Sequence, residues 1–402
     1  TVDEKFSMKY SSGFQIEDVK YPHVPNGSVV CINYISGSPT FLRGVMLTGT
    51  NFLGNLKILH KLKLLNKKDG NVAFLPFAHA FSCTLDLLYG LTVGAHLHIV
   101  NRMGNFKMLL NAFQQVKPKL INTVPAILEL IVRRERDQII NTPLSKFLLK
   151  LPLLNKIVHN KIRKSIFSIF GGSYRELYVG GARLDEEIED FLIKIKFPFS
   201  VGYGMTECAP IISIDTSNEF VPRSCGKVVK ESMQARIRSV DPETIPGEIQ
   251  VKGTHVMAGY YKDPEATSAV FTDDGWLKTG DLGLLDKNNR LYIKGLLKTM
   301  ILGSDGQNIY PTEIEAVLNK MDYVSESIVV DRKGSLVALV YPDHFKLKKD
   351  GLNFSGLEKV MKEHRKELNK RIARYERIMK IELMEDEYEK NEDRIIKREQ
   401  YV

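Results

Sequence analysis

Short apolar runs alternate with stretches of helical periodicity along the first 138 residues. The runs predict strands at 28–35, 45–48, 71–76, 95–100 and 120–125, of which the first has the composition of a buried strand. Between them, helices are predicted at 50–65, 79–88, 105–116 and 126–138. Residues 36–44 are rich in hydroxyl and small side chains and predict a loop. This alternation is typical of parallel α/β units.

Residues 139–172 differ from this pattern because bulky apolar residues mix with lysine and arginine. A basic amphipathic surface that contacts a membrane has this composition. A helix pair that faces the core and exposes a basic side has it too. The second interpretation is favoured, because most amphipathic helices simply face a core.

The second half of the chain begins with one more strand and helix and then changes character. A strand at 177–180 runs into a Gly-Gly turn, a helix follows at 185–195, and 195–200 has the pattern of a buried strand. Short strands and turns at 233–294 predict an antiparallel or barrel-like part. Residues 299–402 predict a separate, small α+β domain.

The composition is that of an ordinary globular protein with two or three domains. The 402 residues are 43% hydrophobic and 26% charged, and no apolar run is long enough to predict a membrane-spanning helix. Four widely separated cysteines argue against a disulfide scaffold or a zinc site and suit a reducing cytoplasm. The net charge of +9 fits an anionic membrane surface or small anionic ligands; nucleic acid is disfavoured because no binding motif accompanies the charge.

Three stretches carry candidate chemistry. The first is VGYGMTE at 201–207, where two glycines permit close backbone approach, an aromatic ring offers a stacking face, and a hydroxyl and a carboxylate can hold a hard cation. The second is TGD at 279–281, in which an acidic residue can accept hydrogen bonds from a ribose diol. The third is the glycine-rich segment 295–315, placed to absorb a movement between domains. Each is also compatible with an ordinary turn.

Together these stretches resemble one family. GYGMTE at 202–207, TGD at 279–281, GQNIYPTEIE at 306–315 and the Gly-Gly-Ala of 180–182 occur in the order and approximate spacing of the adenylate-forming acyl-CoA synthetases, most closely the long-chain fatty-acid–CoA ligases. The resemblance covers essentially all of the chain. It implies an α/β large domain at 1–294 with parallel sheets and a barrel-like part, a hinge, and a small mobile C-terminal domain at 299–402.

The resemblance implies that ATP and a carboxylate form an acyl-adenylate, and that the thiol of coenzyme A then displaces AMP. On the matching positions, Tyr203 borders adenine, Thr206 contacts phosphate, and Glu207 reaches Mg²⁺. Asp281 holds the ribose hydroxyls, and Lys298 marks the hinge at 295–298.

Further positions follow from the same resemblance. Gly180, Gly181 and Ala182 form a backbone wall beside adenine. His79 and Gly204 belong to the acyl pocket; acetate-using relatives have tryptophan at the position of Gly204, so glycine there leaves room for a long fatty acid.

The phosphate-binding loop departs from the family pattern of SGTTGxPKG. The chain has SGSPTFLRG, so Ser36, Gly37, Ser38, Thr40 and Arg43 are the candidate nucleotide ligands. Hydroxyls and a cation remain, but a proline and a lost glycine change which backbone N–H groups can point at phosphate.

Two other positions depart as well. Leu296 stands where the family has an arginine that binds ribose and phosphate, and leucine supplies no donor. In the C-terminal tail, Arg394 aligns with the catalytic lysine, and Lys390 and Lys397 lie nearby as substitutes.

The first subdomain of the family is largely absent before Thr1, and a start other than Met predicts a chain that begins mid-protein or after processing. A missing layer should leave an apolar face exposed unless another segment or a partner chain covers it. Three accounts stay open: a working ligase with peripheral membrane contact or none, a fragment of a longer ligase, and a protein of ligase ancestry that binds adenylate or acyl groups without completing catalysis.

Overall fold

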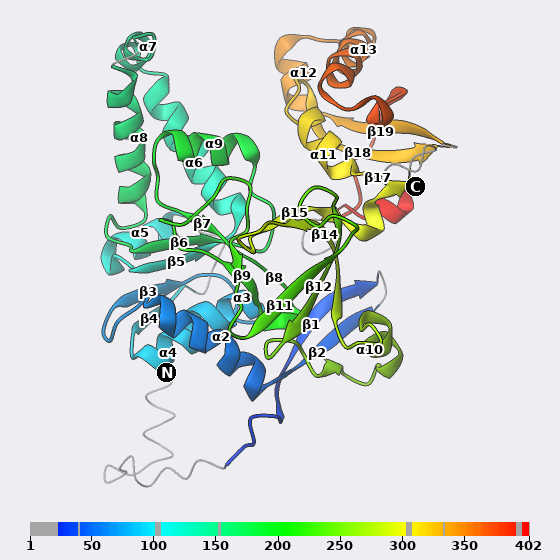
Figure 1. The fold of residues 1–402 in the computed structure, drawn as a ribbon. Coiled ribbons are helices and arrows are strands. Elements are labelled where there is room, and N and C mark those ends of the chain that lie inside the picture. Colours follow the sequence, from blue (N-terminus) through cyan, green and yellow to red (C-terminus); the bar gives the residue numbers. More distant parts are fainter. Residues whose placement is uncertain are drawn as a thin grey trace.

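Two parallel sheets form the centre of the N-terminal half (Figure 1). The computed structural model describes residues 23–38, 41–100, 106–151, 154–302, 308–332, 334–390 and 396–401. In one sheet β3 (Gly70–Ala73) pairs with β4 (His96–Ile99); in the other, β5 (Leu120–Thr123), β6 (Glu176–Val179) and β7 (Ser200–Val201) run in the order β5-β6-β7. The predicted parallel α/β arrangement is confirmed here.

Helices cover these sheets and connect their strands, as parallel pairing requires. Their bounds are α2 (Gly49–Leu62), α3 (Ala80–Ser82), α4 (Tyr89–Val93), α5 (Phe106–Val116), α6 (Pro125–Ile140), α7 (Pro143–Leu149), α8 (Asn155–Ile169) and α9 (Glu186–Lys194). Local signals begin several of them: Thr48 caps α2, proline opens α6 and α7, and Asp185 caps α9.

The predicted helix at 79–88 contains a π-helical stretch, Cys83–Leu88, between α3 and α4. Within it, Asp86 is 1% exposed and accepts hydrogen bonds from Ser82 (2.8 Å), Asn122 (2.7 Å) and Asn71 (3.3 Å). Burial raises the pKa of Asp86 to about 6, although these three donors oppose the shift. A polar cluster therefore lies inside the large core, where periodicity predicts only an amphipathic helix.

Two sequence predictions about β1 (Val29–Ser38) and β2 (Phe41–Thr48) are wrong. Residues 36–38 and 41–44 belong to an antiparallel hairpin, so the loop predicted at 36–44 is wrong for these residues, and 39–40 lie outside the described residues. The first strand is also largely exposed: Val30 is 52% and Tyr34 59% exposed. Within the described residues only β13 (Gly259–Tyr260) extends this sheet, beside β2, so β1 is an edge strand. Val30, Ile32 and Tyr34 are large hydrophobic side chains that this strand leaves exposed.

The prediction of a buried strand at 195–200 is wrong in extent and right in burial. Ile195, Phe197 and Phe199 are each at most 5% exposed, but only the two residues of β7 pair as a strand. The apolar side chains of the preceding turn fill the core below α9, although their backbone does not pair with a neighbouring strand. Tertiary packing thus uses the apolar run without extending the sheet.

An antiparallel part follows, in agreement with the prediction for 233–294. β11 (Met233–Arg238), β12 (Gly247–Gly253), β14 (Leu277–Leu285) and β15 (Leu291–Leu296) pair in the order β11-β12-β14-β15. A second small sheet has the order β10-β9-β8, with β8 (Tyr203–Gly204), β9 (Ile211–Ile214) and β10 (Lys227–Val228). The short helix α10 (Pro264–Val270) lies beside β13.

The C-terminal region, residues 299–401, packs a sheet against helices around its own apolar clusters. The sheet has the order β18-β19-β20, with β18 (Val324–Arg332), β19 (Ser335–Pro342) and β20 (Lys380–Leu383). Its other elements are β16 (Ile301–Leu302), β17 (Asn308–Ile309), α11 (Pro311–Leu318), α12 (His344–Asp350) and α13 (Phe354–Arg371). The region stands beside β14 and β15 in Figure 1.

Candidate nucleotide and metal site

Two of the motifs leave the same edge of one sheet. Strand β6 pairs with β7 in parallel, with Val179 opposite Val201, so 180–182 and 202–207 follow the carboxyl ends of neighbouring strands. The Gly202 N–H donates to the carbonyl of Val179 (3.0 Å). Ligands of open α/β sheets bind at such an edge. The fold therefore brings together two motifs that lie about twenty residues apart.

The Gly-Gly turn has a steric requirement. Gly181 has φ of +85°, a left-handed conformation that favours glycine. A Cβ added at Gly180 would lie 3.1 Å from the Phe81 ring, which belongs to α3. The beginning of α3 is thus packed against this turn, and His79 is exposed at its N-cap position without a side-chain capping bond. His79 lies two residues before Phe81, the residue that packs against Gly180, and its place in an acyl pocket stays a prediction.

Glu207 is the buried acid of the site. It is 5% exposed, lies in the turn Thr206–Cys208, and accepts a hydrogen bond from the Tyr260 hydroxyl (2.9 Å). Its carbonyl also accepts from the N–H of Met257 (2.8 Å), which ties the turn to the segment before β13. Burial raises the pKa of Glu207, while the Tyr260 bond and the charge of Arg43 oppose the shift. A carboxylate kept in a desolvated place with a cation nearby is typical of a ligand-binding group.

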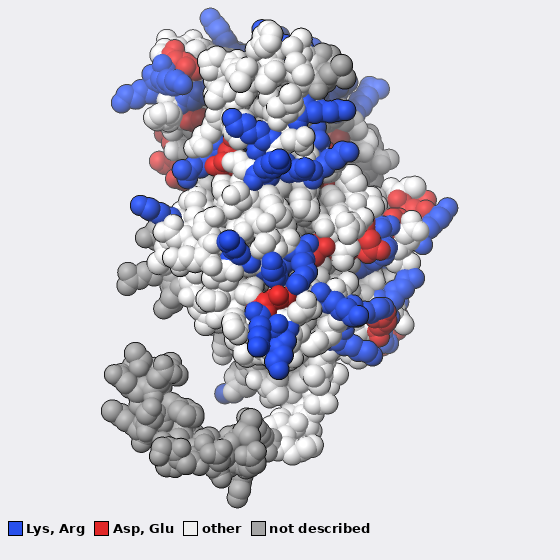
Figure 2. Space-filling view, turned by 90° about the vertical axis from the view of Figure 1, so that its left-hand side faces the viewer, with Lys and Arg blue, Asp and Glu red and all other residues white. Residues whose placement is uncertain are grey.

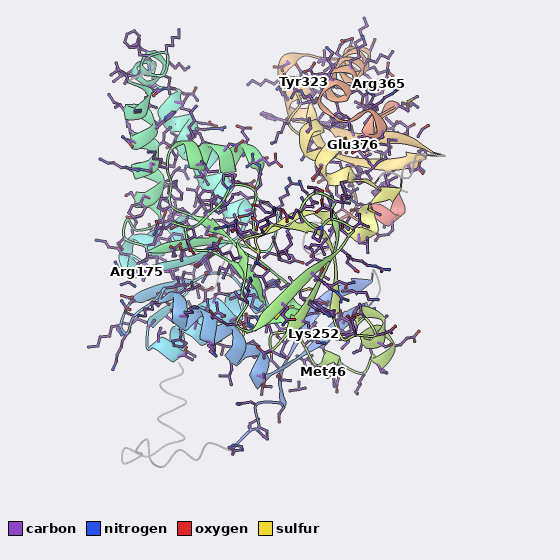
Figure 3. All side chains as sticks on the ribbon, viewed as in Figure 1. Met46, Arg175, Lys252, Tyr323, Arg365 and Glu376 are labelled. Atoms are coloured by element: carbon purple, nitrogen blue, oxygen red, sulfur yellow. The ribbon has the colours of Figure 1, made fainter. Side chains whose placement is uncertain are left out.

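Arg43 is the cation of this cluster. It lies on β2, which pairs with β13 so that Tyr260 lies opposite Val45. Met46, the next residue of β2, is labelled in Figure 3 and lies opposite Gly259. The Arg43 guanidinium lies 5.1 Å from the centre of the Tyr260 ring, and its Nε lies 3.5 Å from a carboxylate oxygen of Asp263. The basic residue of the altered phosphate loop therefore lies next to the tyrosine that binds Glu207.

The ribose candidate lies on another sheet but contacts the first motif. The Tyr203 hydroxyl donates to Oδ2 of Asp281 over 2.5 Å, and burial raises the pKa of Tyr203. Gly280, with φ of +73°, turns the chain just before Asp281. Leu296 is the direct partner of Asp281 between β14 and β15, and it is 39% exposed. Leu296, where the resemblance implies an arginine, is thus adjacent to the ribose candidate.

The residues present fit a magnesium–nucleotide complex. Mg²⁺ is usually held by one or two carboxylates together with substrate phosphates. Glu207 supplies one such carboxylate, and the described residues contain no group of three or more His, Cys, Asp or Glu that would form a cage. Arg43 and Asp281 add a cation for phosphate and an acceptor for hydroxyls. The donor set suits binding through the nucleotide rather than a metal held by protein alone.

Gly204 has a local reason to be glycine. A Cβ built there would lie 2.1 Å from the carbonyl oxygen of Pro210, a contact with backbone that cannot yield easily. The Met205 N–H donates to the same carbonyl (3.0 Å). In this structure the turn around Thr206 and Glu207 therefore leaves no room for a side chain at position 204 whatever the substrate, and the argument from Gly204 to a long acyl chain stays a prediction.

The C-terminal candidates do not meet the Glu207 cluster in the described part of the chain. Lys397 lies 3.4 Å from Glu389, and Lys390 lies 2.8 Å from both Glu326 and Glu387. These partners all belong to the C-terminal region. The structure thus holds both lysines in ion pairs away from the nucleotide candidates.

Several predicted residues fall partly or wholly outside the described residues. Thr40 and Arg394 are among them, and so are residues 303–307 of the glycine-rich segment. For Ser36, Gly37 and Ser38 the structure describes only backbone, which belongs to β1. Lys298 lies in the short turn Leu297–Thr299 after β15, and only its backbone is described. Its role as a hinge stays a prediction.

Three residues of the site were not found from the sequence. Tyr260, Asp263 and Phe81 each contact a predicted residue, through Glu207, Arg43 and Gly180 respectively. The signal was available in part, since an aromatic pair after Gly259 precedes Asp263 and a proline. Periodicity does not tell which strand lies beside β13, so their contacts required the tertiary structure.

A groove of about 590 Å³ lies elsewhere, between α13 and β20. It is lined by residues of both signs and by apolar residues, among them Phe354, Met361, Arg365 and Met379; Arg365 is labelled in Figure 3. The motifs do not converge there. The functional candidates are defined by their contacts, and the groove is not part of them.

Comparison with known proteins identifies the family. Residues 3–261 match the family described as AMP-binding enzyme, and the chain belongs to this family of adenylate-forming enzymes. The match includes Arg43, Glu207 and Tyr260.

Relatives with curated names fall into two groups. The chain is 29% identical over 377 residues to a long-chain-fatty-acid–CoA ligase 5 of Rattus norvegicus, covering 85% of this chain and 53% of that protein. It is 29% identical over 380 residues to a 4-coumarate–CoA ligase of Vanilla planifolia, covering 90% of this chain and 61% of that protein. The chain thus spans between about half and two thirds of the length of these relatives.

Solved structures share the fold. The o-succinylbenzoate coenzyme A synthetase of Bacillus subtilis, in complex with ATP and magnesium ion, aligns with a TM-score of 0.71 at 23% identity, over 94% of this chain and 70% of that one. An ATP-bound RpMatB-BxBclM chimera aligns with a TM-score of 0.73 at 22% identity, over 94% of this chain and 68% of that one. The mixed α/β architecture is therefore that of known adenylate-forming enzymes.

Proposed function

We propose that the protein is an ATP-dependent, AMP-forming acid–thiol ligase whose acid substrate is a long-chain fatty acid. The observation that carries the proposal is the meeting of side chains from separate segments: Glu207 bonded to Tyr260, Arg43 beside them, and Asp281 bonded to Tyr203. A buried acid, a cation and a hydroxyl acceptor are the groups that an ATP–magnesium complex requires. Family membership supports the same chemistry.

Two half-reactions follow. A carboxylate oxygen of the acid attacks the α-phosphorus of ATP, the bond from that phosphorus to the bridging oxygen breaks, and pyrophosphate leaves with the electron pair. The thiolate of coenzyme A then attacks the acyl carbon, and AMP leaves. Mg²⁺, when bound, neutralises phosphate charge as it develops. Glu207 would hold the ion, the Arg43 fork would hold a phosphate oxygen, and Asp281 would accept from the ribose hydroxyls.

The fatty-acid assignment is the finer part of the proposal. It is supported by the rat and yeast relatives that are named long-chain-fatty-acid–CoA ligases, at 29% and 28% identity. Plant relatives named 4-coumarate–CoA ligases are equally similar, so an aromatic acid is the competing substrate.

Pyrophosphate exchange into ATP tests both the ligase activity and the choice of acid substrate. Palmitate, 4-coumarate and o-succinylbenzoate are supplied separately with Mg²⁺, and exchange above background is expected with palmitate alone. Exchange with 4-coumarate alone would keep the ligase and overturn the fatty-acid assignment. Exchange with none of the acids, together with measurable AMP binding, would overturn the ligase.

That last outcome is the second candidate function, a protein of ligase ancestry that binds adenylates. It is favoured by one observation: Leu296 lies opposite Asp281 and brings no donor to the ribose and phosphate. Loss of one transition-state donor typically lowers the rate by about 10²–10³. Binding survives such a loss better than catalysis does.

A further inference from the structure

The α7–α8 hairpin ends in exposed apolar side chains. On α7 and the turn that follows, Leu144 is 68%, Phe147 62% and Leu151 37% exposed. Leu154, just before α8, is 37% exposed and Ile157, in its first turn, 54%. Figure 1 shows α7 at the far end of the projection that α6 and α8 form, away from the sheets. Five large apolar side chains, 37–68% exposed, thus gather at the end of a protruding element.

The other side of α8 packs against the core. Val158, Ile162 and Ile166 recur every four residues and are each at most 2% exposed within the core cluster below. This stripe confirms the interpretation of a helix that faces the core. The apolar residues at the tip lie beyond it and are not used by this packing. The buried side of α8 therefore fits the interpretation of a helix that faces the core, and the exposed tip fits that of a basic amphipathic surface.

The charge of the hairpin has one sign. From residue 138 to residue 174 the sequence contains no Asp or Glu, while its lysines and arginine are Lys146, Lys150, Lys156, Lys161, Arg163 and Lys164. Lys161 and Lys164 follow Ile157 by four and seven residues, so they extend the same exposed face of α8. Figure 2 faces this side of the molecule and shows Lys and Arg side chains standing among white atoms.

The spacing of these charges matches the depth of a bilayer interface. At 1.5 Å per residue, Lys161 and Lys164 lie about 6 and 10 Å from Ile157 along the axis. An apolar element that lies in the interface enters by about 5–10 Å. If the tip entered to that depth, the lysines would reach the phosphate groups. Within the described residues no helix is long and apolar enough to span a membrane, so the contact would be peripheral.

We propose that the tip of the α7–α8 hairpin docks this protein on an anionic lipid surface. The charged side chains of the hairpin are all basic, so they complement an anionic surface, and the apolar side chains lie at its protruding end (Figure 1). A bilayer accepts isolated apolar side chains on a convex element with a basic collar. The inference does not rest on ligase activity.

Flotation with vesicles tests the proposal on the whole chain. Vesicles of phosphatidylcholine alone are compared with vesicles that contain about 30% phosphatidylglycerol, a content that gives a negative surface potential. The protein is expected to float with the anionic vesicles, and less so in about 1 M salt, where the Debye length falls to about 3 Å. Absence of flotation with the anionic vesicles would overturn the proposal.

Two variants separate the contributions of the tip. Phe147→Ser is expected to lower the partition coefficient about tenfold, because an aromatic side chain no longer enters the lipid. Replacing Lys156, Lys161 and Lys164 by Gln is expected to lower it about fivefold for each lysine. The three lysines are exposed, so thermal unfolding should match that of the parent chain.

A matched control comes from the C-terminal region. Phe345 on α12 is 82% exposed and also has lysines nearby, at positions 346, 348 and 349. Phe345→Ser is expected to leave flotation unchanged. An equal loss with Phe345→Ser and Phe147→Ser would overturn the assignment to the hairpin. Concentration-dependent self-association that Phe147→Ser abolishes, without vesicle binding, would instead assign the tip to a contact between two copies.

Discussion

Buried and exposed carboxylates of this protein are stabilised in opposite ways. In the N-terminal half, Glu207 and Asp86 lie in the interior, where burial raises the pKa of each. In the C-terminal tail, Glu387 and Glu389 are exposed: Lys390 lowers the pKa of Glu387, and hydrogen bonds from Gln400 and then Lys397 lower the pKa of Glu389. The interior acids therefore favour the protonated form, and the tail acids favour the charged form.

This difference separates what the two regions can do. A desolvated acid such as Glu207 is better balanced when a cation arrives, so it is suited to a ligand. The tail acids already have their cations, since Lys397 pairs with Glu389 and Lys390 with Glu387. The lysines that would serve in catalysis are thus held in ion pairs, while the buried acid that would hold the metal has a raised pKa and would gain from a cation. Under the proposal, the acid of the site is therefore available to a ligand, and the tail lysines are not.

The largest expected effect belongs to Glu207→Gln. The amide keeps the size of the side chain and its contact with Tyr260 but removes the charge that would hold Mg²⁺. Acid-dependent pyrophosphate exchange is expected to fall by about 10²–10³, the cost typical of one transition-state group. Glu265→Gln, an exposed acid on nearby α10, is the control and should leave exchange unchanged. A full rate in Glu207→Gln would remove this acid from the site.

Asp86→Asn tests a buried acid that serves the fold alone. The folded protein holds a proton on Asp86 up to a pKa of about 6, against an ordinary value of 3.8. Stability from this group is complete below pH 3.8 and is lost as pH rises through 6, a change of up to ~3 kcal/mol. The amide cannot ionise, so urea unfolding of Asp86→Asn should lack this decline and show a higher free energy of unfolding at pH 7. The same pH dependence in both proteins would contradict the assignment.

Asp281→Asn should act on binding. It removes the charge that accepts from Tyr203 and, under the proposal, from ribose hydroxyls. Hydrogen bonds to charged groups contribute about 1.5–3 kcal/mol, so AMP affinity in calorimetry is expected to fall about ten- to a hundredfold. Asp273→Asn, an exposed acid in the turn before β14, provides the comparison and should bind AMP normally. Equal affinities for the two variants would place the ribose elsewhere.

Leu296→Arg is a gain-of-function test of the altered wall. The new guanidinium would stand opposite Asp281 and supply paired donors to ribose or phosphate. We expect AMP to bind about tenfold more tightly, a gain of ~1.4 kcal/mol. Leu297→Arg, at a neighbouring position that is 38% exposed against 39% for Leu296, should bind as the parent does. A gain at Leu297 of the same size would point to general charge attraction.

The smallest effect is expected from Lys397→Gln. Its pair with Glu389 is exposed, and exposed pairs contribute little to folding. Thermal unfolding should therefore stay within the error of the parent chain. If exchange nevertheless falls strongly, Lys397 leaves Glu389 and reaches the substrate during the reaction, and the contrast between the tail and the wall would hold only for the conformation described.

Much of the architecture could be predicted from apolar periodicity. The helices and parallel strands of the N-terminal half and the antiparallel part at 233–294 are confirmed, because burial on one face leaves a regular pattern in sequence. The errors fall where burial and pairing separate. The turn before β7 is apolar and buried without being a strand, and β1 is apolar and paired without being buried.

The sequence by itself determined the family and the identity of the motif residues. Glycines at positive φ, a Thr-Glu pair and an acid in a turn are local choices of residue, so they are visible in one dimension. The tertiary structure alone decided which of them meet. Tyr260 joins Glu207 to Arg43 because β13 pairs with β2, and Tyr203 reaches Asp281 across two sheets. Such contacts depend on strand order and close approach between distant segments, which no local pattern encodes.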